Sequence, residues 1–157
     1  MQLTELYDKP GHLIRRAQQI AVAIFCEECR DLDITPAQYD ILLAIRSLPG
    51  IDATHLSQLV ALDRSSLATA LERLERKGLI LRHSDKKDRR MKLIYLAPTG
   101  NRLLRDAEQA FIAAQKRILA PLTRSEQWQF LRLLEQLVTL NNVHSRVPLK
   151  PPDRGTA

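Results

Sequence analysis

The segment from Asp63 to Gly100 carries the pattern that most constrains how this chain can fold. A helix is predicted for residues 64–77, and Gly78 suits its end because glycine adopts the left-handed conformation common after a helix. Runs with the apolar and β-branched content of strands follow at 79–84 and 91–96. The polar link between these runs predicts a hairpin with a charged tip. One side of the helix is apolar, through Leu67, Ala70, Leu71 and Leu74.

The net charge of the whole chain is concentrated in this segment. Between Arg64 and Lys92 there are ten Lys and Arg against four Asp and Glu, whereas the rest of the chain holds fourteen of each. Lys and Arg that neutralise phosphates release counterions and supply much of the affinity of a protein for nucleic acid. The charge excess therefore makes nucleic acid the first partner to consider.

Helices are predicted on both sides of this segment, because apolar residues recur at helical spacing. Thr35 and Gln38 can form a capping box for one of them, and Thr123 and Glu126 for another. The predicted ranges are 11–32, 36–47, 53–60, 98–119 and 124–141. The helix at 53–60 and the helix at 64–77, separated by a few residues, have the outline of a helix-turn-helix. The expected fold class is mainly α with a small β-wing, a winged helix-turn-helix domain plus a helical dimerisation region.

The chain is expected to divide into four parts. The helices of its first and third parts have more apolar surface than a small winged domain can cover, which favours a two-fold dimer in which the terminal helices pack together. The last part is rich in Pro and polar residues and is expected to be a disordered tail. The four parts are residues 1–34, 35–97, 98–145 and 146–157.

Several classes of protein are disfavoured by what the sequence lacks. Residues 1–11 do not have the basic and apolar regions of a secretory signal, and the apolar run Ile20–Cys26 is too short to cross a bilayer. A cytoplasmic protein with no membrane partner is therefore expected. No nucleophile–base pair, phosphate-binding loop or metal-ligand cluster is evident, so an enzyme is not expected.

Cys26 and Cys29 form a single C-x-x-C motif. A structural zinc needs four ligands, and no second pair of Cys or His residues accompanies this one. Thioredoxin-like chemistry needs the motif at a helix N-terminus, whereas here it falls late in a predicted helix. Two ordinary, semi-buried cysteines are expected, with a redox role as the alternative.

In this order of elements the chain resembles the MarR family of winged helix-turn-helix regulators. Over residues 10–145, the stretches that carry the resemblance are Leu32 to Tyr39, Arg64 to Ser66, Leu74 to Ile80, Asp85 to Arg90 and Leu96 to Gly100. The most specific are Asp85-Lys86-Lys87-Asp88-Arg89-Arg90, similar to the D-x-x-D-R-R wing of the family, and Leu96-Ala97-Pro98-Thr99-Gly100. Ala97 stands where the family usually has Thr, which should weaken the cap of the helix at 98–119.

The resemblance implies a homodimer that binds a pseudo-palindromic operator in double-stranded DNA. The 64–77 helices would enter successive major grooves and the wings the adjacent minor grooves, with Arg90 as the wing-tip arginine and Asp88 holding the tip in shape. A narrow minor groove attracts arginine by its negative potential. Ser65, Ala68 and Thr69 are candidates for base contacts, and Ser66, Arg73 and Arg76 for phosphate contacts. The remaining candidates for DNA contacts are Arg64, Lys86, Lys87 and Arg89.

The start of the chain, Tyr7 to Gln19, is similar to the branch of the family that controls the catabolism of hydroxycinnamates and related aromatic acids. His12, Arg15, Arg16 and Gln19 lie on one helical stripe, and a guanidinium can hold a carboxylate or phosphate in bidentate fashion. Tyr39 and Arg46 are further pocket candidates. The expected effector is a hydroxycinnamate, a hydroxybenzoate or an aroyl-CoA thioester that releases a repressor from DNA. A solvated polar face is the alternative explanation of the stripe.

Two other functions remain open at this point. One is a regulator that senses oxidants through Cys26 or Cys29. The other is a winged-helix module that binds protein and not DNA. Against the second, a protein-binding wing has no need for the five cations Lys86, Lys87, Arg89, Arg90 and Lys92.

Overall fold

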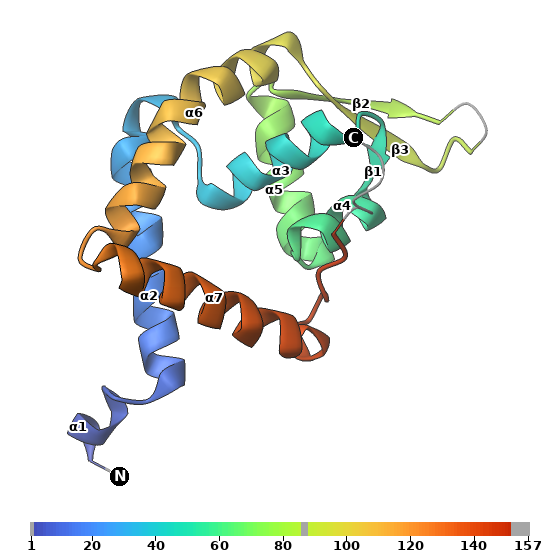
Figure 1. Ribbon diagram of the computed structural model, residues 1–157. Helices are drawn as coiled ribbons and strands as arrows, with labels where there is room; N and C mark the ends of the chain where they lie inside the picture. The colour runs from blue at the N-terminus through green and yellow to red at the C-terminus, as the bar shows by residue number, and fades with distance from the viewer. Residues whose placement is uncertain (1, 86–87, 152–157) are drawn as a thin grey trace.

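The computed structural model describes residues 2–85 and 88–151, and in these residues the chain is mainly helical, as the sequence predicted (Figure 1). The helices are α1 (Leu3–Leu6), α2 (Pro10–Glu28), α3 (Pro36–Ser47), α4 (Ala53–Val60), α5 (Arg64–Arg76), α6 (Pro98–Leu119) and α7 (Arg124–Leu140), with short 3-10 helices η1 (Arg30–Leu32) and η2 (Asn142–His144). The strands are β1 (Ile51–Asp52), β2 (Ile80–Ser84) and β3 (Lys92–Leu96). No helix in the described part of the chain has the length and apolarity needed to cross a membrane.

These elements form a compact unit and a helical frame. The winged unit, which consists of α3, α4, α5 and the three strands, lies to one side of α2 and α6, and those two long helices pack along each other (Figure 1). From the end of α6, α7 runs back beneath α4 and α5, and the chain then rises along α4. The winged unit is therefore contacted by α2 and α6 on one side and by the residues that follow α7 on another.

The sheet has three antiparallel strands in the order β1-β3-β2. Ile80 pairs with Leu96 and Ser84 with Lys92, so the hairpin predicted from the sequence is present. The short β1 pairs with the other edge of β3, Ile51 opposite Ile94, and was not predicted. Two residues are too few to show an alternating pattern, so this strand exists only because β3 is beside it.

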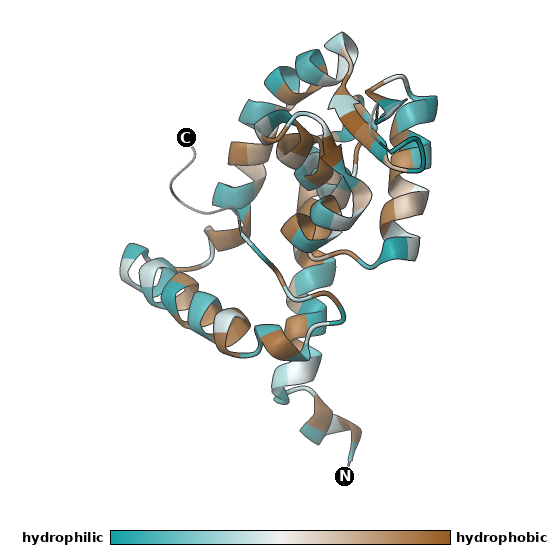
Figure 2. Ribbon diagram, turned by 90° about the vertical axis from the view of Figure 1, so that its right-hand side faces the viewer, coloured by the Kyte–Doolittle hydropathy of each residue, from teal (hydrophilic) through white to brown (hydrophobic). Residues whose placement is uncertain are grey.

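The core lies between α3, α4, α5, β3 and the first half of α6. Ile41, Leu42, Ile45, Leu56 and Leu74 are fully buried in it. Hydrophobic residues accordingly face inward on these helices, and they also recur along α7, which lies apart from the core (Figure 2).

An aromatic cluster joins the frame to the winged unit. Tyr39 of α3 stacks on Phe111 of α6 with ring centroids 4.5 Å apart, and Phe25 of α2 meets Tyr39 edge-on at 6.2 Å. Such pairs stabilise beyond the area that they bury. Tyr39 is only 5% exposed, so the structure places it in the core and not on an open ligand pocket, in contrast to the sequence expectation.

The structure departs from the prediction by more than a single residue in three further segments. The first long helix ends at Glu28 and not at residue 32, because Cys29 leaves the helical conformation (φ -101°, ψ 18°) and the chain continues as the short η1, which ends at a left-handed Asp33 (φ 46°). The short helix α1 was not expected. Residues 146–151, expected to belong to a disordered tail, pack against α4, where the Lys150 N–H donates to the Gln58 carbonyl at 3.0 Å. The rest of that expected tail, 152–157, lies outside the described residues.

The predicted helix caps are present. Thr35 and Gln38 form a reciprocal capping box at α3, with hydrogen bonds of 3.1 and 3.3 Å, and Thr123 and Glu126 form another at α7. No side-chain cap is found at Ala97, as expected from the missing Thr. Instead, the Thr99 hydroxyl donates to the Gly78 carbonyl, which ties the start of α6 to the end of α5.

Gly100 is the position where the packing of α6 against Leu79, the residue before β2, leaves no room for a side chain. A Cβ at this site would overlap the carbonyl oxygen of Leu79 and lie 3.1 Å from its carbonyl carbon. We expect Gly100→Ala to lower the free energy of unfolding by about 1 to 3 kcal/mol, as overpacking does, although alanine is the better helix former. Urea or thermal denaturation measures this change.

Gly11 provides the matched control, because it also lies in the first turn of a helix but a Cβ there would meet nothing within 4 Å. Gly11→Ala should leave stability unchanged or raise it by up to roughly 1 kcal/mol. Equal effects of the two substitutions would contradict the close approach of α6 to Leu79.

Candidate nucleic-acid interface

The turn between α4 and α5 is held by local hydrogen bonds. Ala61 takes a left-handed conformation (φ 50°), and the Ser57 hydroxyl donates to the Leu62 carbonyl at 2.6 Å. Asp63 then caps α5, since its carboxylate accepts from the Ser65 and Ser66 N–H groups at 3.1 and 3.0 Å. These bonds fix the angle at which α5 leaves α4.

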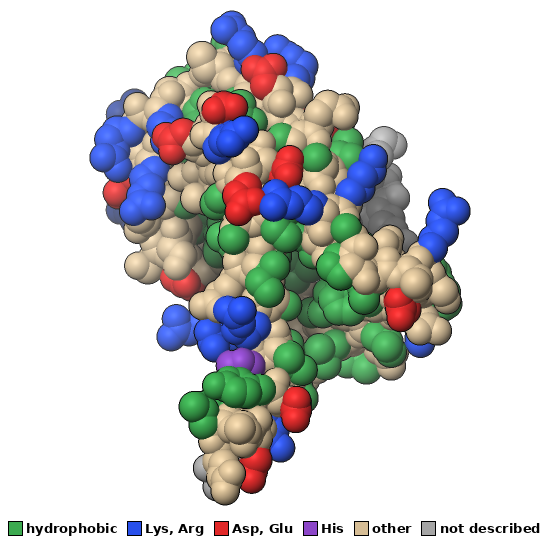
Figure 3. Space-filling model, turned by 90° about the vertical axis from the view of Figure 1, so that its left-hand side faces the viewer, with side chains coloured by type: hydrophobic (Ala, Val, Ile, Leu, Met, Phe, Trp, Pro, Cys, Tyr) green, Lys and Arg blue, Asp and Glu red, His purple; other side chains and the backbone are tan. Residues whose placement is uncertain are grey.

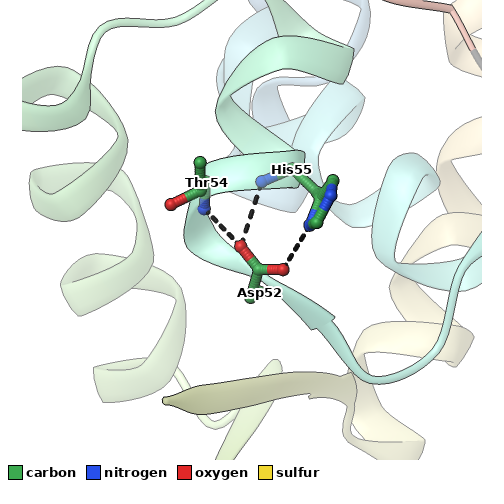
Figure 4. Close-up of polar contacts among 3 residues, drawn as sticks. All are labelled: Asp52, Thr54 and His55. Carbon is green, nitrogen blue, oxygen red and sulfur yellow. Dashed lines mark hydrogen bonds and ion pairs between the residues drawn. The ribbon is translucent and has the colours of Figure 1, made fainter. Parts of the chain in front are cut away.

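Asp52 performs the same task at the start of α4 (Figure 4). One carboxylate oxygen accepts from the N–H groups of Thr54 and His55 at 2.8 and 3.1 Å, and the other contacts the imidazole Nδ1 of His55. Partial burial would raise the pKa of Asp52, but the hydrogen bonds from His55 and Thr54 outweigh it and lower the pKa overall. The cap therefore stabilises the fold above the ordinary aspartate pKa and is lost as pH falls through the lowered one.

The helix α5 presents the polar face that the sequence predicted. Leu67, Leu71 and Leu74 are buried against the winged unit. The candidate contact residues on this helix are all exposed, namely Arg64, Ser65, Ser66, Ala68, Thr69, Arg73 and Arg76. The Ser66 hydroxyl donates to the Asp63 carboxylate at 2.8 Å, so it completes the cap.

The C-terminal end of α5 lies beside the N-terminus of α3. Arg73, Arg76 and Lys77 line a shallow hollow of about 500 Å³ together with Thr35 and Gln38. Lys77 is paired with Asp33, with 2.8 Å between its Nζ and the carboxylate. Arg73 and Arg76 extend the positive charge of α5 toward this second helix end, an arrangement suited to phosphates that flank a groove.

The wing is joined to α5 by an ion pair that the sequence reasoning missed. The guanidinium of Arg82 on β2 pairs with the Glu75 carboxylate on α5, with its Nε at 2.9 Å. Near the far end of the same strand, the Lys92 Nζ donates to the Ser84 hydroxyl at 2.6 Å. No local sequence signal shows the first pair, because the turn at Gly78 brings residues seven apart onto adjacent elements.

The described part of the wing tip is shaped by Asp88. Its carboxylate accepts the Arg90 N–H at 2.9 Å, and its carbonyl accepts the Met91 N–H at 2.9 Å. Arg89 and Arg90 are exposed at this tip. Lys86 and Lys87, also candidates for DNA contacts, lie outside the described residues.

The polar stripe on α2 lies on the surface of the single chain. Arg15, Arg16 and Gln19 are exposed, and an Arg16 guanidinium nitrogen donates to the Gln19 carbonyl oxygen at 3.2 Å. His12 is half-buried against the Tyr7 ring, with ring centroids 5.4 Å apart. Toward the projecting N-terminal end, the molecule shows a His side chain beside a group of basic side chains (Figure 3). Arg46, on α3, is exposed.

The two cysteines are not alike, which corrects the expectation of two semi-buried residues. Cys26 is exposed, whereas Cys29 is 1% exposed. Burial, with smaller contributions from Cys26 and Glu28, raises the pKa of the Cys29 thiol. The thiolate is the reactive form, so Cys29 is held in its less reactive state at neutral pH. No cluster of possible metal ligands occurs among the described residues.

The helix α7 has a large apolar surface with nothing packed on it. It contains no buried residue, and Trp128 is 66% exposed and Leu131 50%. Six more large apolar residues are exposed along it, namely Phe130, Leu133, Leu134, Leu137, Val138 and Leu140. Hydrophobic side chains gather over the same lower part of the molecule (Figure 3). Apolar patches of this kind mark protein–protein contacts.

The helix-turn-helix and the basic hairpin match a known family of regulators. A model of the MarR family matches residues 32–91. A protein described as a transcriptional regulatory protein for the hcr operon of Thauera aromatica is 31% identical over 128 residues, covering 81% of this chain and 77% of that protein. The chain belongs to the MarR family. It is thus a DNA-binding transcriptional regulator and not an enzyme.

Solved structures of two other regulators share most of this arrangement. Bordetella bronchiseptica BpsR, whose DNA binding is regulated by 6-hydroxynicotinic acid, has a TM-score of 0.77 and 28% identity, covering 83% of this chain and 94% of that one. The transcriptional repressor CouR, bound to a 23-mer DNA duplex, has a TM-score of 0.78 and 25% identity, covering 88% and 98%. The MarR fold therefore extends over the helical frame as well as the winged unit.

Arg90 provides the sharpest test of the wing. It is exposed, and its backbone is held by Asp88 in a tight tip. We expect Arg90→Ala to weaken binding to duplexes of any sequence by about 1 to 3 kcal/mol, because a minor-groove arginine responds to groove width and potential more than to base identity. Fluorescence anisotropy with labelled duplexes measures this loss.

Arg124→Ala is the control, since this exposed arginine opens α7, far along the chain from the wing. It should bind DNA within twofold of the unaltered protein. If both variants lost affinity equally, the effect would be one of total charge and the wing would have no special role.

Proposed function

We propose that this MarR-family protein is a homodimeric repressor that binds a pseudo-palindromic operator and is released by a small aromatic acid or its CoA thioester. The observation that carries the proposal is the bare apolar face of α7, together with a DNA-binding helix on the same protomer. A second copy of the chain offers the same face, and a two-fold axis lets each copy cover the other. The buried area would hold the two winged units at a fixed separation.

The geometry of the winged unit supports a particular mode of DNA binding. In this mode the exposed face of α5 enters the major groove, Ser65, Ala68 and Thr69 approach the bases, and the wing tip reaches the adjacent minor groove. Two copies would place two α5 helices about one helical turn apart, near 34 Å. The 23-mer bound by the relative CouR spans roughly two turns at about 10.5 base pairs each, which accommodates two such half-sites.

The aromatic effector is supported by the α2 stripe and by the relative BpsR. Arg15 and Arg16 can hold a carboxylate, and His12 and Tyr7 provide adjoining ring surface. In a dimer the N-terminal helices would lie near the paired α7 helices, so the stripe would face a cleft. The acid acts only if it binds the DNA-incompetent arrangement more tightly than the competent one. Tyr39 is buried in the core of the single chain, so the proposed contacts are those of the exposed stripe.

The proposed dimer is tested by placing a charge in the α7 face. Leu134 is 38% exposed in the single chain. We expect Leu134→Glu to convert the dimer to a monomer, because burying an unpaired carboxylate is costly, and to abolish the high-affinity binding that depends on two half-sites. Analytical ultracentrifugation and binding to full and half operators measure both effects.

Gln136→Glu is the control. It introduces the same charge two residues after Leu134, on the polar side of α7. It should remain a dimer. A monomeric unaltered protein, at concentrations where it binds the operator, would contradict the proposal.

The effector is tested by competition. The operator is first selected in vitro from random duplexes. The complex of protein and operator is then titrated with hydroxybenzoates, hydroxycinnamates and their CoA thioesters. We expect at least one to dissociate the complex, and Arg15→Ala to raise the required concentration at least tenfold by removing a carboxylate contact. Gln18→Ala, on an exposed neighbouring position, is the control.

No release by any of these compounds at millimolar concentration would refute the effector. If a compound released the protein from DNA equally well after Arg15→Ala, the effector would be supported, but its binding site would lie elsewhere than the α2 stripe.

A further inference from the structure

Residues 142–151, which follow α7, return to the winged unit and pack against α4. The 3-10 helix η2 turns the chain, which then rises along α4 (Figure 1). We refer to residues 142–151 as the strap. None of the DNA, dimer or effector contacts proposed above uses it.

The strap completes the end of α4. The last carbonyls of a helix have no partner within it. In α4 the Ser57 carbonyl accepts the N–H groups of Ala61 and Leu62, and the Gln58 carbonyl accepts the N–H of Lys150 at 3.0 Å. The strap therefore satisfies a backbone group of the helix-turn-helix itself.

The strap is folded by its own side-chain bonds. The Asn142 side-chain amide forms two hydrogen bonds with the backbone of Leu149. Its nitrogen donates to the Leu149 carbonyl at 3.0 Å, and its oxygen accepts from the Leu149 N–H at 2.8 Å. The Ser145 hydroxyl bonds to both backbone groups of Val147, at 2.9 and 3.3 Å. Such bonds give a short segment a preferred conformation.

Leu149 extends this contact to a second helix beside α4. It lines the groove between α3 and α4 with Leu43 and Leu59. At the other end of the turn, the Ser66 backbone N–H does most to lower the pKa of Asp63, and the charge of Arg146 is the smallest cause in the same direction. The strap thus approaches the turn that sets the angle of α5.

Without the strap, the far end of α7 would be free of the winged unit. Among the element pairs that pack closely in the described residues, α7 packs only with η2, whereas the winged unit is joined to the frame through α2, α3 and α6. The strap is therefore a second attachment, at the opposite side of the winged unit from the aromatic cluster. A body held at two points pivots less than a body held at one.

We propose that the strap ties the C-terminal end of α7 to the helix-turn-helix and so fixes the orientation of α5 relative to the dimer interface. The inference rests on the proposed dimeric DNA binding for its consequence, which is strict selection of half-site spacing. Few bonds hold the strap, and Leu149 remains 43% exposed, so opening should be a low-energy local event. An open strap would let the two α5 helices sample a range of separations.

The test compares Asn142→Ala with Asn141→Ala. The Asn142 amide holds the strap, whereas the Asn141 amide donates to the Leu137 carbonyl within α7, at 2.8 Å. A chain that ends at Ser145 is a third variant. Each is measured for oligomeric state, for hydrogen exchange of the 146–151 amides, and for binding to the in-vitro-selected operator and to the same operator with two base pairs inserted between the half-sites.

All three variants should remain dimers, because the α7 face is intact. The unaltered protein and Asn141→Ala should protect the Lys150 amide and lose at least tenfold in affinity on the insertion. Asn142→Ala should lose this protection, and both Asn142→Ala and the truncated chain should lose less than threefold on the insertion. Equal spacing discrimination by the truncated chain would overturn the proposal.

Failure of the proposed function is recognised separately. If the unaltered protein were a monomer or bound no duplex, the dimeric repressor would be refuted, and the exchange experiment would still decide whether the strap is docked. A Lys150 amide that exchanges in the unaltered protein as fast as in an unfolded peptide refutes the strap in either case.

Discussion

The burial of Leu67, Leu71 and Leu74 on one side of α5 is the constraint on which the DNA-binding surface depends. Because the leucines of α5 lie on the side of the helix that packs in the core, the residues on the opposite side must face outward. The small and hydroxyl side chains at its start and the arginines at its end are therefore presented together. The packing of the core therefore decides which face of α5 is available to a duplex.

The orientation of this surface depends on elements beyond the helix. Asp52 and Asp63 cap the two helices of the turn, and the Glu75–Arg82 pair connects α5 to the wing. The Thr99 hydroxyl and the close approach of Gly100 to Leu79 then lock α6 onto the same region. The helix and the wing are consequently held as one unit, which in the proposed mode of binding would meet the major and minor grooves together. In that mode the charge of the wing would strengthen binding, while these contacts between α5, α6 and the wing would supply its geometry.

The helical frame couples this unit to a second copy and to an effector in the function proposed here. The aromatic stack of Tyr39 and Phe111 holds one side of the winged unit, and the strap reaches the other side. The stripe on α2 lies on the same frame. A ligand that shifts the paired frames would therefore change the separation of the two α5 helices without touching either of them. The weaker attachment, through Lys150 and Leu149, is the one that such a shift would break most easily.

Much of this protein could be predicted from local sequence because its signals act over a few residues. Apolar spacing gave the positions of six helices, capping boxes at Thr35 and Thr123 marked helix starts, and the two runs around the basic link gave the hairpin. The excess of Lys and Arg between Arg64 and Lys92 pointed to DNA. A helix cap forms between residues three apart, and a charge excess lies within one segment of the chain. Both can therefore be recognised from the sequence before the tertiary structure is known.

Tertiary structure alone decided the features that join distant segments. The strand β1 exists because Ile51 meets Ile94, the ring of Tyr39 is buried because α3 crosses α6, and the ion pair of Glu75 and Arg82 forms because the hairpin folds back on α5. The same holds for residues 146–151, whose proline-rich composition suggested disorder but whose backbone completes the end of α4. Amino-acid composition indicates whether a segment would be ordered in isolation. Residues 146–151 are ordered by the Gln58 carbonyl at the end of α4, more than eighty residues earlier in the chain, and only the tertiary structure brings this carbonyl and the segment together.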